Sequence, residues 1–118
     1  SMIEQASQLA SQRLVVGSWL LTKDACEALA VVLSIKDVPT DAATMEDTGL
    51  LLLRTQIYVK HTGAAYAAHK ALQQLSVLCF NVNDEFIESL PLKWVSFLIA
   101  IRCAIQLSGG VLVTRLAF

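Results

Sequence analysis

The segment from Leu14 to Ile35 is apolar almost all the way round a helix, and no other feature of the sequence constrains the fold as strongly. Its only charged residues lie close together and are Lys23, Asp24 and Glu27. A helix with so narrow a polar stripe is normally covered by other elements. We therefore expect a helix over Ile3–Ile35, broken or kinked near Gly17, whose second half is the central, buried helix of the fold. Pro39 ends it.

The composition agrees with a chain that buries much apolar surface. The 118 residues are 55% hydrophobic and 16% charged, with a formal net charge of −1, whereas average soluble domains are about 25% charged. This excludes intrinsic disorder and gives no overall electrostatic argument for a nucleic-acid binder. Three widely spaced cysteines do not suit a disulfide-stapled secreted module. We expect a single all-helical domain over residues 1–118, located in the cytoplasm.

Turn-forming residues divide the remainder of the chain into lengths typical of helices. We expect a second helix to begin at Thr44, because Thr44–Asp47 has the form of a capping box. Its basic C-terminus is Lys60–His61, and Gly63 closes it in the left-handed conformation. Both basic residues are then placed at the negative end of the helix dipole.

Two further helices are expected. The third covers Ala64–Phe80 with Asn81 as its C-cap, and Asp84–Glu88 forms a short turn. The fourth runs from Pro91, which suits a first helical turn, to Leu107. The pattern makes no strong prediction for Val111–Phe118.

These segments predict an all-α fold of four to five antiparallel helices, either an armadillo/HEAT-like helical-repeat fragment or a helical bundle. No internal repeat is legible in the residues. The stretch Trp94–Phe118 is the best candidate for a membrane span, but Arg102 and Gly109–Gly110 interrupt it. We therefore expect a buried helix there and no membrane span.

The residue types that carry chemistry are better explained by structural roles. Cys26, Cys79 and Cys103 lie among apolar helical neighbours and are expected in the core. His61 and His69 lack the i, i+4 spacing of a helical metal pair, and His61 is expected to be a surface residue near a helix end. We predict no catalytic, metal-binding or cofactor-binding residue and no enzymatic activity. An enzyme that uses Cys79 with His69 is the weakest alternative.

One local cluster of basic side chains could contact RNA phosphates. It consists of Arg54, Lys60, His61 and Lys70. No acidic residue lies between Arg54 and Lys70, and Tyr58 or Tyr66 could stack on a base. The alternative is an ordinary solvated face of a helix pair.

Five segments, taken in order, resemble the thyroid adenoma-associated protein family, which includes the regulatory subunit of a eukaryotic tRNA 2′-O-methyltransferase. In the first, a hydrophobic run ends in a tryptophan that is followed by a lysine and an acid. The third is similar to a basic-His-x-Gly-Ala turn between two helices of that family. The segments are Leu14–Ala25, Gly49–Leu53, Lys60–Ala64, Ala71–Cys79 and Leu90–Trp94. The resemblance spans roughly residues 14–98 in the same order and spacing.

The resemblance implies a fragment of a long helical-repeat scaffold with no catalytic residue or cofactor of its own. A methyltransferase catalytic subunit, which holds S-adenosylmethionine and modifies a ribose in the tRNA anticodon loop, is the implied partner, and tRNA is a second candidate partner. A secondary implication is a link to calcium-pump regulation. The basic Arg-Arg-Ser-Ala-Gly segment that follows Trp94 in the family has no counterpart at Ser108–Val111. The alternative function is a small helical protein–protein interaction module, an obligate homodimer without an RNA role, that self-associates through apolar helix faces.

Overall fold

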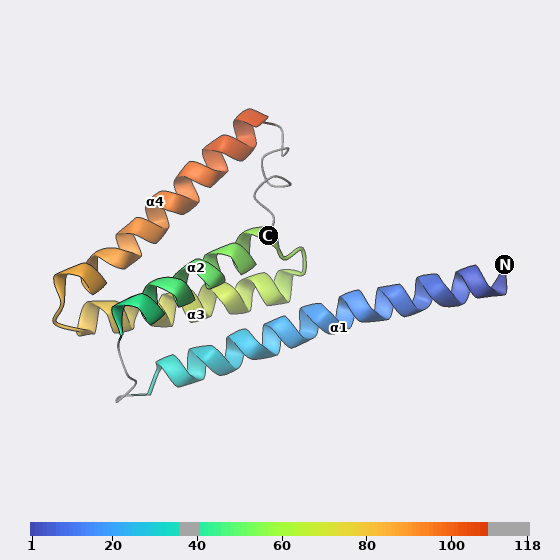
Figure 1. Cartoon of the computed structure of the whole chain (residues 1–118), viewed down its shortest axis with the longest axis horizontal. Helices are drawn as coiled ribbons and strands as arrows, with labels where there is room; N and C mark the ends of the chain where they lie inside the picture. Colours follow the sequence, from blue (N-terminus) through green and yellow to red (C-terminus); the bar gives the residue numbers. More distant parts are fainter. Residues whose placement is uncertain (36–40, 109–118) are drawn as a thin grey trace.

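The computed structural model describes residues 1–35 and 41–108, which form four α-helices and no strand. They are α1 (Met2–Leu33), α2 (Ala42–Tyr58), α3 (Thr62–Asn81) and α4 (Glu85–Ser108). Figure 1 shows short turns between α2 and α3 and between α3 and α4, and the N-terminal half of α1 extending beyond the other three helices. The all-α prediction is confirmed. The segment Val111–Phe118 lies outside the described residues.

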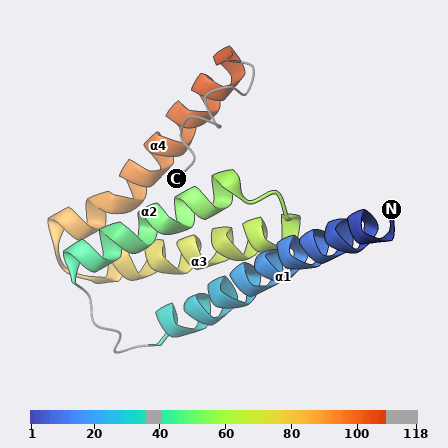
Figure 2. The same ribbon diagram turned by 45° about the vertical axis from the view of Figure 1, so that its right-hand side comes forward.

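The central helix is α3, which packs against α1, α2 and α4 (Figures 1 and 2). Its buried stripe consists largely of small side chains, and its members are Ala64, Ala67, Ala68, Ala71, Leu72, Leu75 and Cys79. Alanines leave room for neighbouring helices to approach closely, because there is no side chain beyond Cβ to separate them. The core of the chain therefore forms around α3.

The prediction that Leu14–Ile35 forms the central helix is wrong. Only Cys26 and Leu33 of α1 are buried, and α1 packs mainly along one face of α3. An apolar surface on all sides shows that a helix could be covered, but coverage requires a neighbour on each side. Among residues 1–35 and 41–108, α1 has such a neighbour on one side only.

The helix α1 is continuous through Gly17, so the predicted break is also wrong. A single glycine costs about 1 kcal/mol inside a helix, which is less than the hydrogen bonds that a break would remove. At the start of α1, the Ser1 hydroxyl accepts a hydrogen bond from the Glu4 backbone N–H at 3.3 Å, and the Glu4 carboxylate accepts one from the Ser1 amino group at 3.3 Å. This capping box stabilises the projecting end.

The boundaries of α2 differ from those expected. Asp41, not Thr44, is the N-cap: Asp41 Oδ2 accepts hydrogen bonds from the backbone N–H and from the hydroxyl of Thr44, both at 3.0 Å. The helix ends at Tyr58, before Lys60 and His61, and Gly63 lies within α3 instead of closing α2. A carboxylate accepts a backbone N–H more strongly than a hydroxyl does, so the earlier cap prevails.

The helix α4 begins at Glu85, so all of the separate turn predicted at Asp84–Glu88 except Asp84 is part of the helix. Asp84 Oδ1 accepts a hydrogen bond from the Ile87 backbone N–H at 3.1 Å. Pro91 therefore lies inside the helix and not in its first turn. Likewise, Asn81 is the last residue of α3 and not its C-cap.

Burial of α4 is confined to its N-terminal part, where Ile87, Leu90 and Trp94 are covered. After Trp94 the side chains are mostly exposed, so the buried helix predicted there is not observed within this chain. By length and composition α4 could cross a membrane: its most apolar 18-residue window has a mean hydropathy of 1.5 and is 17% buried. Such a helix is weak evidence for a span, and the expectation that there is none remains a prediction.

Candidate protein and RNA interface

His61 joins the turn between α2 and α3 to the side of α1. It is the N-cap of α3, and its Nδ1 accepts a hydrogen bond from the Ala64 backbone N–H at 3.1 Å. Because Nδ1 accepts this bond, the ring proton is on Nε2. The His61 ring also lies against the Trp19 ring of α1, with centroids 5.7 Å apart and planes tilted by 30°. The prediction that His61 is a surface residue at a helix C-terminus is therefore wrong, since it begins α3 and is half-buried.

We expect His61→Ala to lower the free energy of unfolding by about 1–2 kcal/mol, since it removes both the cap and the contact with Trp19. His61→Asn replaces the Nδ1 acceptor by a capping amide oxygen and loses only the ring contact, so it is expected to recover about half of that loss. Urea unfolding followed by circular dichroism measures both variants. Equal losses for the two would show that the cap contributes nothing.

Lys70 is held over the Tyr66 ring, with its Nζ 5.3 Å from the ring centroid. Both residues border a hollow of about 330 Å³ between α3 and α1 that is also lined by Glu27. Lys70 follows His61 by nine residues, which is about 13 Å along the axis of α3. This separates Lys70 from the α2–α3 turn.

The structure divides the four basic candidates into two groups. Arg54, Lys60 and His61 lie at the end of the bundle where α2 meets α3, and Arg54 and Lys60 are exposed. Lys70 lies farther along α3 beside Tyr66. An RNA backbone that touched both groups would therefore run along α3 from its N-terminus.

The Cys79–His69 alternative does not form a catalytic pair. The two residues are ten apart on α3, about 15 Å along the axis. Cys79 is fully buried, and burial raises the pKa of its thiol to about 11, whereas a reactive cysteine needs a lowered pKa. His69 Nδ1 lies 3.2 Å from Gln56 Nε2 of α2. In residues 1–35 and 41–108, no group of three or more His, Cys, Asp or Glu could hold a metal ion.

Cys26 and Cys79 are buried as predicted, but Cys103 is exposed on α4, and its apolar neighbours Ile101 and Ile105 are only half-buried. We expect iodoacetamide at pH 8 to alkylate Cys103 within minutes. Cys79 should react only after unfolding, because its thiol is protonated well above that pH and is inaccessible. Mass spectrometry of the folded and the urea-unfolded protein measures this. Rapid labelling of Cys79 in the folded protein would contradict the packing of α3.

Gly49 of α2 lies directly against the indole of Trp94 of α4. A Cβ at position 49 would overlap the Trp94 ring carbons Cζ2, Cε2 and Cη2. Trp94 is 2% exposed, and its Nε1 has no hydrogen-bond partner in the described part of the chain. The contact between α2 and α4 therefore requires a residue without a side chain at position 49. In the sequence, a glycine inside an otherwise apolar helical segment was the feature that could have predicted this close contact.

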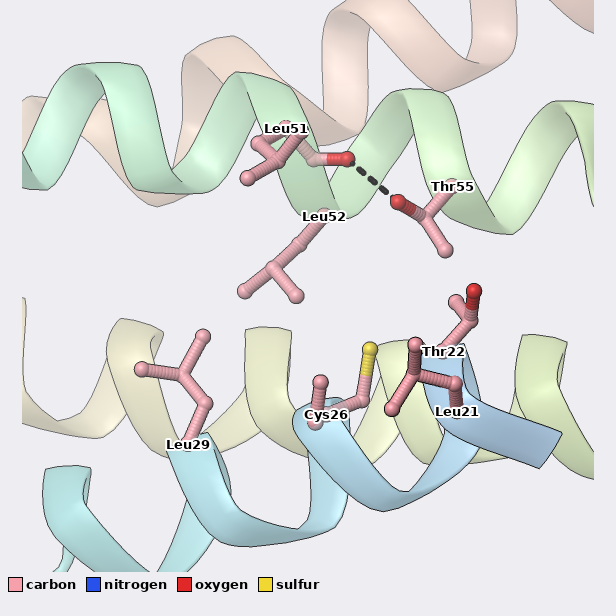
Figure 3. A pocket seen from close by; sticks show the side chains of 8 residues that line it. Leu21, Thr22, Cys26, Leu29, Leu51, Leu52 and Thr55 are labelled. Carbon is pink, nitrogen blue, oxygen red and sulfur yellow. Dashed lines mark hydrogen bonds between the residues drawn. The ribbon is translucent and has the colours of Figure 1, made fainter. Parts of the chain in front are cut away.

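An apolar groove of about 270 Å³ separates α1 from α2, with α3 behind it (Figure 3). The Thr22 hydroxyl donates to the Ser18 carbonyl at 2.9 Å and the Thr55 hydroxyl to the Leu51 carbonyl at 2.8 Å. Both hydroxyls are thus satisfied within their own helices. The groove presents mainly aliphatic groups, from Leu21, Thr22, Ala25, Cys26, Leu29, Leu51, Leu52 and Thr55.

A comparison with protein families identifies the chain. The family model described as THADA/TRM732, DUF2428 matches residues 2–115. The chain belongs to the THADA/TRM732 family. Searches of curated proteins and of solved structures found no match.

The THADA/TRM732 match confirms the resemblance seen in the sequence and extends it over nearly the whole chain. The structure brings the resembling segments together in pairs. Trp19 of the first segment meets His61 of the third, and Gly49 of the second meets Trp94 of the fifth. Membership of the THADA/TRM732 family indicates a role related to tRNA modification.

Proposed function

We propose that this chain is part of a non-catalytic helical scaffold that assists a tRNA ribose 2′-O-methyltransferase acting on the anticodon loop. The match to the THADA/TRM732 family over residues 2–115 is the observation that carries the proposal. In this proposal the methyltransferase supplies the catalytic residues and S-adenosylmethionine, and the chain works in the cytoplasm. Its contribution is to position the enzyme and the tRNA.

The basic side chains along α3 are the proposed tRNA contacts. Lys60 is exposed at the turn, and Lys70 is exposed beside Tyr66. A phosphate backbone that follows α3 could meet both charges, and the Tyr66 ring, 59% exposed, could stack on an unpaired base. Arg54 lies at the same end of the bundle as Lys60 and extends this surface over α2.

Loss of the gene tests the scaffold role directly. We expect a clean deletion to abolish ribose methylation in the anticodon loop of the target tRNA, measured by mass spectrometry of the purified tRNA. The intact protein should also capture the methyltransferase in a pull-down. Normal methylation in the deletion strain would contradict the proposal.

Charge reversal tests the RNA surface separately. We expect Lys60→Glu combined with Lys70→Glu to weaken tRNA binding at least about tenfold. The slope of binding affinity against salt concentration should also fall by the amount that corresponds to the loss of about two phosphate contacts. Arg102→Glu is the matched control, because Arg102 is an exposed basic residue on α4, away from this surface. Equal losses in both variants would show that only overall charge matters.

The second candidate function is a protein–protein interaction module without an RNA role. The exposed apolar side chains of α1 and α4 favour it, since monomeric proteins rarely expose such continuous apolar faces. Unchanged tRNA binding in the charge-reversal variant, together with normal tRNA methylation in the deletion strain, would support this candidate.

A further inference from the structure

The helix α1 carries an apolar stripe that none of α2, α3 and α4 covers. It lies about 130° around the helix axis from the face of Cys26 and Leu33, which packs on α3. Each of its members is exposed and none is charged; they are Ile3, Ser7, Ala10, Leu14, Gly17, Ser18, Leu21, Ala25, Ala28 and Val32. The stripe runs the full length of α1, including the half that projects beyond the bundle (Figure 1).

The order of side-chain sizes along this stripe is the same in both directions from its centre. The centre lies between Gly17 and Ser18, which is also the midpoint of α1. Residues equally far from it match in size: Leu14 with Leu21, Ala10 with Ala25, Ser7 with Ala28 and Ile3 with Val32. An antiparallel pair of identical helices related by a two-fold axis at this point would place each residue opposite its counterpart. Large side chains would then meet large ones, and small would meet small.

The charges beside the stripe agree with the antiparallel direction. Arg13 and Asp24 lie on the same flank of the stripe, and neither has an ion pair within the described part of the chain. In the antiparallel pair, Arg13 comes within one turn of the partner's Asp24, and the two-fold axis repeats this contact. In a parallel pair Arg13 and the partner's Asp24 would lie on opposite flanks and eleven residues, about 16 Å, apart along the axis, so they would not meet.

The groove between α1 and α2 widens the same surface. Leu21 and Ala25 of the stripe line this groove together with Leu51 of α2, which is 59% exposed (Figure 3). The projecting half of a second α1 would lie along the stripe and contact Leu51. Each bundle would then receive the N-terminal half of the other copy.

The exposed area is large enough for such an interface. A folded chain of this mass is expected to expose about 6,300 Å², whereas this chain exposes 8245 Å². A stable interface buries about 800 Å² on each partner. The surplus therefore exceeds what one dimer contact requires.

We infer that two copies of this chain form an antiparallel dimer through the α1 stripe, with the two-fold axis at Gly17 and Ser18. This inference goes beyond the proposed function, since it requires neither tRNA nor methyltransferase. It makes α1 the dimer helix and leaves the basic surface of α3 free. The dimer is closed, because both copies use the same stripe.

Analytical ultracentrifugation of the whole chain over a range of concentrations tests the dimer. We expect a dimer whose dissociation constant rises at least about a hundredfold in Leu14→Asp, since the change places a carboxylate against an apolar partner in both copies. Leu14 is 75% exposed, so the helix content should be unchanged by circular dichroism. Leu9→Asp is the control: Leu9 is exposed on another face of α1, and its replacement should leave the dimer intact. A monomer, or equal losses in both variants, would overturn the inference.

Disulfide trapping tests the direction of the helices. In a Cys103→Ser background, a mixture of Leu14→Cys and Leu21→Cys chains should form mixed disulfides in preference to self-disulfides. Preferential self-disulfides would indicate parallel helices and overturn the antiparallel dimer.

Charge exchange is an independent test of the direction: Arg13→Asp and Asp24→Arg should each weaken the dimer, and their combination in one chain should restore it. Failure of that restoration would also contradict the proposed direction.

Discussion

Replacement of Leu75 by alanine is expected to lower the free energy of unfolding by about 3–4 kcal/mol. Leu75 lies at the middle of the buried stripe of α3 and is 1% exposed. Its truncation leaves a cavity beside α3, the helix that contacts all three others. The lost free energy of unfolding therefore includes both the transfer energy of the removed apolar atoms and the cost of the cavity. Urea unfolding followed by circular dichroism measures it.

Val77→Ala on the same helix is the matched control. Val77 is 55% exposed, so its truncation is expected to change the free energy of unfolding by less than about 0.5 kcal/mol. Similar losses for Leu75→Ala and Val77→Ala would contradict the central position of α3. The comparison therefore tests the arrangement of the helices and not the helix content of α3.

Replacement of Gly49 by alanine is expected to destabilise the protein by about 2–3 kcal/mol, although alanine is the better helix former. The gain in helix propensity is about 1 kcal/mol, but the added Cβ overlaps the Trp94 ring, which is too buried to move aside. The overlap should separate α4 from α2. Faster hydrogen exchange of the first turns of α4 would report that separation.

Two further variants make the Gly49 prediction specific. Within one chain Gly17 has no atom within 4 Å of an added Cβ, so Gly17→Ala should be neutral or stabilising by up to about 1 kcal/mol when it is measured on the monomer, at concentrations below the dissociation constant of the dimer. In a Trp94→Leu background, Gly49→Ala should lose most of its cost, because the ring that it overlaps is gone. Additive losses for the two changes would show that they do not act through one contact.

The existence of four helices could be predicted from the sequence, because each apolar segment is long and is bounded by turn-forming residues. Their boundaries could not. Asp41 and Thr44 can both cap a helix, and His61 can end one helix or begin the next. The difference between such alternatives is about 1 kcal/mol. Contacts with other helices, such as that of His61 with Trp19, are large enough to decide it.

The candidate site was predictable as a set of residue types and not as a surface. The order of the segments around Trp19, Gly49, His61 and Trp94 was sufficient to recognise the family. Which segments meet depends on how the helices pack. The structure pairs Trp19 with His61 and Gly49 with Trp94, and it places Lys70 apart from Lys60.

The sequence by itself determined the all-α fold, the family and the burial of Cys26 and Cys79, since helix periodicity, motif order and local apolar surroundings are properties of the chain. Only the tertiary structure decided which helix is central. The alanines of α3 allow three helices to approach it closely, whereas α1, whose second half is apolar nearly all round, is covered on one side. Burial is a relation between elements, so hydrophobicity alone could not rank them. For the same reason, the large apolar fraction of the chain became an exposed stripe on α1 and not a buried core helix.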